Sequence, residues 1–148
     1  MSIAEIEAAF PGLSARGYDV TSQQTPFYNC IAWAAGDSRR WWWPVLSPMA
    51  YWPPSVPREE TLKRFVEAFG TLGHEPCDNS GLEPGFEKVA IYAIPGGSPT
   101  HAARQLPSGY WTSKLGKWED IEHHTIDGVE SRDYGVVVQV LKRPIIAL

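Results

Sequence analysis

The spacing of hydrophobic residues predicts helices in the first half of the chain. In segment 59–70 the apolar residues recur at spacings of three and four, which is typical of an amphipathic helix. An acidic first turn and two following glycines give this helix a start and an end. Segment 3–9 predicts a shorter helix that is stopped by Pro11-Gly12, and segment 17–28 is polar and irregular. The apolar positions of the longer helix are Leu62, Phe65, Val66 and Phe69.

A different pattern, rich in β-branched and alternating residues, predicts strands in the second half. A PSG tripeptide between the second and third segments signals a hairpin turn, and HEPCDNSGLEPG (74–85) predicts a loop. The last segment, GVVVQVLK, is the most β-branched, so we expect it at the centre of the sheet. Helices followed by antiparallel strands indicate an α+β domain. The predicted strands are 88–93, 100–106, 110–115 and 135–142.

Composition narrows the class of protein. The 148 residues are 43% hydrophobic and 20% charged, which is the balance of one globular domain spanning 1–148. A net charge of −4 argues against nucleic-acid binding, since that rests on basic patches. We expect no membrane partner because no run of 18 apolar residues exists, and no signal peptide because the N-terminus lacks a basic region. The expected localisation is cytoplasmic, or export by a leaderless route.

The string TPFYNCIAWAAGD (25–37) holds the first candidate for chemistry. Asn29 is a good N-cap residue, so Cys30 would stand in the first turn of a helix that ends near Gly36. A helix N-terminus and a nearby imidazolium both lower the pKa of a thiol. His101, at the start of a predicted strand, is the best candidate for that imidazole. The alternative is that Cys30 is a small buried hydrophobe, because free cysteine is among the most buried residue types.

The segment WWWPVLSPMAYWPPSVP (41–57) holds five prolines and four tryptophans. Proline breaks regular elements, so we expect an ordered loop that hugs the surface. Its tryptophans would either pack the core or wall a cleft for sugars or an extended peptide. The period of a strand puts Gln105 on the same face as His101, and therefore beside such a cleft. The candidate substrate-binding residues are Trp42, Trp43, Trp52 and Gln105.

Two further arrangements are weaker candidates. The spacing of His74 and Cys77 is compatible with zinc if His123 and His124 complete the site, although a plain loop thiol explains Cys77 equally well. Both cysteines are expected to be thiols, because a chain without a secretory leader seldom carries a disulfide. Ser113-Lys114 would be the pair of a serine–lysine enzyme, or simply the end of a strand.

Longer strings carry a resemblance to a known group of proteins. YNCIAWAAGD, the following WWWP and YWP, and PTHAARQLPSGYWTSKLGKWEDIEH resemble a family of small, mostly bacterial proteins of unknown function, over residues 26–143. The order of Cys30 and then His101 resembles that of papain-like and NlpC-type cysteine peptidases and amidases. This second resemblance implies a papain-like fold, in which N-terminal helices pack on a C-terminal antiparallel sheet.

The same resemblance implies two supporting roles. A glutamine six residues before the nucleophile donates to the oxyanion in papain-like enzymes, and Gln24 stands at that offset, with Gln23 next to it. A third group orients the histidine from the following strand. That strand, 110–115, has no carboxylate, so we expect Asp120 or Glu122 just beyond it to serve.

The sequence therefore predicts a cysteine hydrolase acting on an amide bond of a peptide or protein, with no metal or organic cofactor. Cys30 would attack, and His101 would accept its proton and later protonate the leaving group. The alternatives are a non-catalytic module that binds protein or glycan through segment 41–57, and a bacterial toxin or effector of the same fold with an immunity protein as partner.

Overall fold

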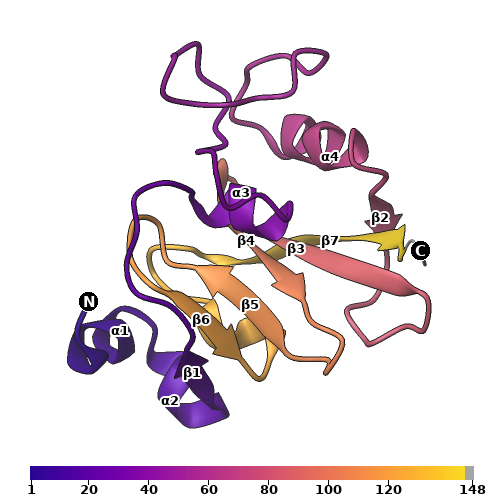
Figure 1. Ribbon diagram of the computed structural model, residues 1–148. Helices are drawn as coiled ribbons and strands as arrows, with labels where there is room; N and C mark the ends of the chain where they lie inside the picture. The colour runs from indigo at the N-terminus through magenta and orange to yellow at the C-terminus, as the bar shows by residue number, and fades with distance from the viewer. Residues whose placement is uncertain (146–148) are drawn as a thin grey trace.

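The computed structural model describes residues 1–145, which form an α+β fold around one seven-stranded antiparallel sheet (Figure 1). The strands lie in the order β1-β6-β5-β4-β3-β7-β2. Their bounds are β1 Tyr18–Val20, β2 Glu75–Cys77, β3 Phe86–Ala93, β4 Pro99–Gln105, β5 Trp111–Lys114, β6 Asp120–His123 and β7 Val136–Pro144. The helices are α1 Ile3–Ala9, α2 Pro11–Arg16, α3 Cys30–Ala34, α4 Leu62–Gly70 and the short 3₁₀ helix η1 Ile126–Val129.

Helices α1, α3 and α4 follow the predicted segments, whereas α2 and η1 were not predicted. Pro11 was expected to stop helical structure, but it occupies the first position of α2, where its missing N–H costs nothing. Helix α4 begins at Leu62 rather than at 59, because the Thr61 hydroxyl caps it by accepting from the N–H of Arg64. None of the helices in residues 1–145 is long and apolar enough to cross a membrane.

The four predicted strands are confirmed within two residues of their expected ends, and three short strands were missed. Strands β1, β2 and β6 have only three or four residues, and two of them are the edges of the sheet, where alternation has no room to show. Because β1 lies between α2 and α3, the chain does not divide into a helical half and a sheet half. The expectation that 135–142 is central was wrong: β7 is second from the edge, and Val136 and Val138 are exposed.

Each face of the sheet has its own hydrophobic core. On the α3 side, α3 and α4 cover the sheet, and Trp42, Trp52 and Val56 of segment 41–57 join their core. On the α1 side, α1, α2 and η1 cover the opposite face (Figure 1). Neighbouring residues of β4 enter different cores: Ala102 lies in the α3-side core and Ala103 in the α1-side core. This alternation decides which candidate residues can meet.

Candidate functional site

Asn29 ties the start of α3 to the tryptophan-rich segment. Its Oδ1 accepts from the N–H of Ala32 at 3.2 Å, which confirms the predicted N-cap. The same oxygen accepts from the N–H of Trp42 at 3.0 Å, and the Asn29 amide donates to the Trp42 carbonyl at 2.7 Å. Asn29 is buried, so these bonds fix segment 41–57 against α3.

Cys30 begins α3 as predicted, but its thiol lies in the α3-side core. The residue is only 6% exposed, and its Sγ donates a long hydrogen bond of 3.9 Å to the carbonyl of Thr100. Burial raises the pKa of the Cys30 thiol to about 11. The thiol is therefore protonated at neutral pH, despite its position at a helix N-terminus.

His101 lies on the opposite face of the sheet from Cys30, so the predicted nucleophile–base pair does not form. His101 pairs with Tyr92 across strands β3 and β4, and its ring stacks on Tyr134 at a centroid distance of 4.1 Å on the α1 side. The backbone of β4 separates that ring from the thiol. The physical reason is strand alternation: Ala102, not His101, faces α3.

The imidazole of His101 belongs to a buried relay of side chains. Its Nε2 lies 2.9 Å from the Oγ of Ser113, which lies 2.8 Å from Nε2 of His123, whose Nδ1 lies 2.8 Å from the carbonyl of Thr125. A carbonyl only accepts, so Nδ1 of His123 carries the proton, Ser113 donates to His123, and His101 donates to Ser113. Nδ1 of His101 is then an acceptor without a partner among residues 1–145.

Burial also keeps both rings of this relay uncharged. It lowers the pKa of His123 to about 4, and it lowers the pKa of His101 well below its ordinary value, with the neighbouring His123 as a smaller cause. Both histidines are fully buried on the α1 side. The relay therefore holds β4, β5 and β6 together, and it is closed to substrate.

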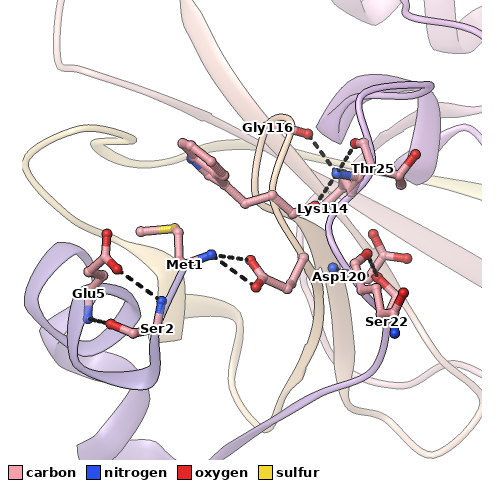
Figure 2. A network of polar contacts seen from close by, with 11 residues as sticks. Met1, Ser2, Glu5, Ser22, Thr25, Lys114, Gly116 and Asp120 are labelled. Atoms are coloured by element: carbon pink, nitrogen blue, oxygen red, sulfur yellow. Dashed lines mark hydrogen bonds and ion pairs between the residues drawn. The ribbon is translucent and has the colours of Figure 1, made fainter.

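The two candidate carboxylates do not orient His101 either. Asp120 accepts from the Tyr28 hydroxyl at 2.7 Å and its backbone N–H donates to Ser22, a contact visible in Figure 2. Burial raises the pKa of Asp120. Asp120 on β6 pairs with Lys114 on β5, and both side chains face the α3 side. Glu122, two residues along β6, faces the same side. Both therefore lie across the sheet from His101.

Gln24, the expected oxyanion donor, is exposed, and its side chain makes no hydrogen bond with any residue in 1–145.

The segment before Cys30 is held instead by the buried Lys114, which the sequence analysis considered as the end of a strand. The Lys114 ammonium donates to the carbonyls of Thr25 at 2.8 Å and Gly116 at 3.0 Å (Figure 2), and to that of Trp118. Ser113 points to the other face, so no serine–lysine pair forms.

The residues considered for zinc are scattered. Cys77 lies on β2 and its Sγ donates to the carbonyl of Asn79 at 3.5 Å, while Nδ1 of His74 is bonded to the carbonyl of Phe69. His123 belongs to the relay on the α1 side. Within residues 1–145 no three histidine, cysteine or carboxylate side chains gather in a way that would hold a metal ion.

Two of the tryptophans expected to wall a cleft are core residues. Trp42 and Trp52 are buried, and each indole N–H has a partner, Asp37 for Trp42 at 2.9 Å and the Pro57 carbonyl for Trp52 at 3.2 Å. Trp43 is half-buried. The packing alternative therefore holds for Trp42 and Trp52.

Gln105 also lies away from segment 41–57. Its amide donates to the carbonyl of Ser80 at 2.9 Å, and it lines a different cavity, near the loop at residues 82–86.

The exposed apolar residues of this region were not singled out by the sequence. Phe27 is 73% exposed, Leu46 88% and Met49 82%. They lie at or beside two adjoining hollows of about 440 and 370 Å³, which we call together the Trp41 surface. Figure 1 shows the loops of segment 41–57 projecting beyond α3, away from the sheet. Both hollows are lined by Pro26, Trp41, Met49 and Ala50; the first also includes Phe27, Arg39 and Arg40, and the second Trp43 and Val45.

Two arginines, Arg39 and Arg40, line the first hollow, although the chain as a whole has a net charge of −4. The Arg40 guanidinium lies 3.7 Å from the ring centre of Tyr51 and pairs with Asp37 at 2.8 Å. Arg39 is exposed, and its side chain forms no ion pair with any residue in 1–145. Arg39 thus leaves an uncompensated positive charge beside the hollows.

Comparison with known proteins identifies the family of the chain and no activity. No curated protein and no solved structure matches it. Residues 19–142 match the family described as Domain of unknown function (DUF7689), and the chain belongs to this family.

Proposed function

We propose that this protein is a peptide-binding module whose Trp41 surface receives an extended segment of a partner protein. The observation that carries the proposal is the pair of adjoining hollows lined by Phe27 and Met49, large apolar side chains that are more than 70% exposed; Leu46, 88% exposed, follows Val45 of the second hollow in the chain. A large exposed apolar patch beside hollows is typical of a binding site. Two hollows of similar size, joined through Trp41, suit two apolar side chains of one extended peptide.

The chemistry of the hollows favours a peptide over a glycan. Sugar binding needs amide or carboxylate side chains beside the aromatic ring to hold the hydroxyl groups. The residues lining these hollows are tryptophan, phenylalanine, proline, methionine, valine and alanine, with arginine and tyrosine as the polar ones. The charge of Arg39 selects an acidic residue next to the apolar ones. The partner sequence is therefore apolar or proline-rich, with an adjacent aspartate or glutamate.

Selection from a random peptide library, with affinities measured on synthetic peptides, tests this proposal. Met49→Asp is expected to weaken binding at least tenfold, because it puts a carboxylate into both hollows. Arg39→Glu is expected to weaken the binding of peptides that contain aspartate or glutamate more than the binding of the same peptides with asparagine or glutamine in those positions. Ile3→Asp, at an exposed apolar residue of α1, and Arg132→Glu are the matched controls and should bind as the native protein does. Selected peptides that bind the Met49→Asp variant equally well would overturn the proposal.

The cysteine hydrolase remains a second hypothesis, supported by Cys30 at the capped start of a helix packed on an antiparallel sheet. A papain-like form of this α+β fold would need an imidazole on the α3 side. Since His101 lies on the other side, we expect Cys30 to react with iodoacetamide on the order of 100-fold more slowly than Cys77 at pH 7.5.

Mass spectrometry of each cysteine against pH measures these rates. The slow reaction of Cys30 is expected to track global unfolding, and Cys30→Ala is expected to leave peptide binding unchanged. A fast reaction of Cys30 with an apparent pKa below the free-thiol value of about 8.5 would favour the hydrolase instead.

A further inference from the structure

A separate cavity lies where the hairpin between β4 and β5 approaches the loop before β3. Its volume is about 410 Å³, which is within the range of sites for small molecules. Most of its wall is apolar, and Arg104 is its unpaired cation. The apolar lining residues are Leu82, Pro84, Phe86, Leu106, Pro107 and Ile145.

Arg104 is held in position but is not neutralised by a direct partner. Its Nε donates to the carbonyl of Trp33 at 3.4 Å, and its guanidinium lies 5.2 Å from the ring centre of the same tryptophan. The two terminal nitrogens make no hydrogen bond or ion pair within residues 1–145. The side chain is half-buried, so a free guanidinium here is a strong attractor for an anion.

The two carboxylates of the cavity are already paired with other cations. Glu83 contacts Lys142 at 2.9 Å and Lys88 at 3.3 Å, and Glu87 contacts Arg143. Neither carboxylate forms an ion pair with Arg104, although the charge of Glu87 acts on it from a greater distance. The N–H donors of the Arg104 side chain are therefore left available to a ligand.

We propose that this cavity binds a small amphipathic carboxylate, with its head group on Arg104 and its apolar body against Leu106 and Ile145. The planar guanidinium presents parallel N–H donors that match the two oxygens of a carboxylate. The apolar wall excludes a purely polar anion, and the free positive charge disfavours an amine. This site is separate from the Trp41 surface and does not depend on the peptide-binding proposal.

Titration with octanoate, followed by two-dimensional ¹H–¹⁵N NMR, tests the proposal. Octanol and acetate serve as probes that keep only the tail or only the head group. Octanoate is expected to shift the amide signals of residues 82–87 and 104–107 and to bind at least tenfold more tightly than either control. Arg104→Met should remove that preference over octanol, while Arg132→Met, which deletes an exposed arginine elsewhere, should keep it.

A second pair of variants decides the question if Arg104→Met fails to fold. Leu82 is an exposed loop residue at the cavity, so either charge is tolerated there. The Leu82→Glu variant should bind octanoate at least threefold more weakly than the Leu82→Lys variant, because the added carboxylate repels the anion. Equal binding of octanoate and octanol to the native protein, equal binding of octanoate to the two Leu82 variants, or shifts confined to other residues would overturn the proposal.

Discussion

Replacing Asn29 by alanine is expected to lower the free energy of unfolding by about 3 kcal/mol, as the sum of a lost N-cap and two lost buried hydrogen bonds. The substitution strands the N–H and the carbonyl of Trp42, both of which Asn29 satisfies. It also leaves the N–H of Ala32 without its cap. Because Trp42 adjoins Trp41, peptide binding at the Trp41 surface should fall with it.

Urea unfolding followed by tryptophan fluorescence measures this change. Thr61→Ala is the matched control, since Thr61 caps α4 through one bond and ties down no other segment. That control should cost about 1 kcal/mol and leave peptide binding intact. Asn29→Asp keeps the accepting oxygen but puts a buried carboxylate oxygen against the Trp42 carbonyl, so its loss should be at least as large as that of Asn29→Ala. A loss for Asn29→Ala no larger than that for Thr61→Ala would show that Asn29 acts only as a cap.

Asn29 also shows what sequence alone can predict. The cap preference of asparagine placed the start of α3 correctly, and the spacing of apolar residues predicted α4 to within three residues of its start. Both signals are local, since the residues that create them are neighbours on one helix. The second role of Asn29, as an anchor for Trp42, joins segments 13 residues apart and leaves no local signal.

His101 shows where local signals fail. The sequence placed it on a strand, and the structure confirms the strand. Which face its side chain takes depends on the register of β4 against β3, and a shift of one residue would exchange His101 for Ala102. Lys114 is a similar case, since nothing local indicates that backbone carbonyls would surround a buried ammonium.

The sequence also could not show which of the aromatic and apolar residues in segment 41–57 are exposed. Segment 41–57 was correctly predicted as an ordered loop, but its exposed binding candidates include Leu46 and Met49, while Trp42 and Trp52 are buried. Phe27 comes from outside the segment. Hydrophobic residues tend to be buried, but which of them fit into the core depends on the tertiary structure.

Acidification from pH 6.5 to 5.5 is expected to lower the free energy of unfolding by about 3 kcal/mol, because three buried histidines take up protons only when the chain unfolds. Burial lowers the pKa of His74 and of His123 to about 4, and it lowers that of His101 well below its ordinary value. In the unfolded chain each has a pKa near 6.5. The unfolded state therefore binds more protons in this interval, so the histidines' contribution to stability is complete above pH 6.5 and is lost as the pH falls towards 4.

Urea midpoints measured at several pH values between 7.5 and 5 give the slope of stability against pH. His123→Gln should reduce that slope by about 1 kcal/mol per pH unit between pH 6.5 and 5.5, a third of the native value. Ser113→Ala is the control, since it breaks the relay between His101 and His123 without removing a titrating group. It should lower stability equally at every pH and leave the slope unchanged. A native slope near zero between pH 6.5 and 5.5 would mean that the relay admits protons in the folded state, and His101 would again be a candidate for chemistry.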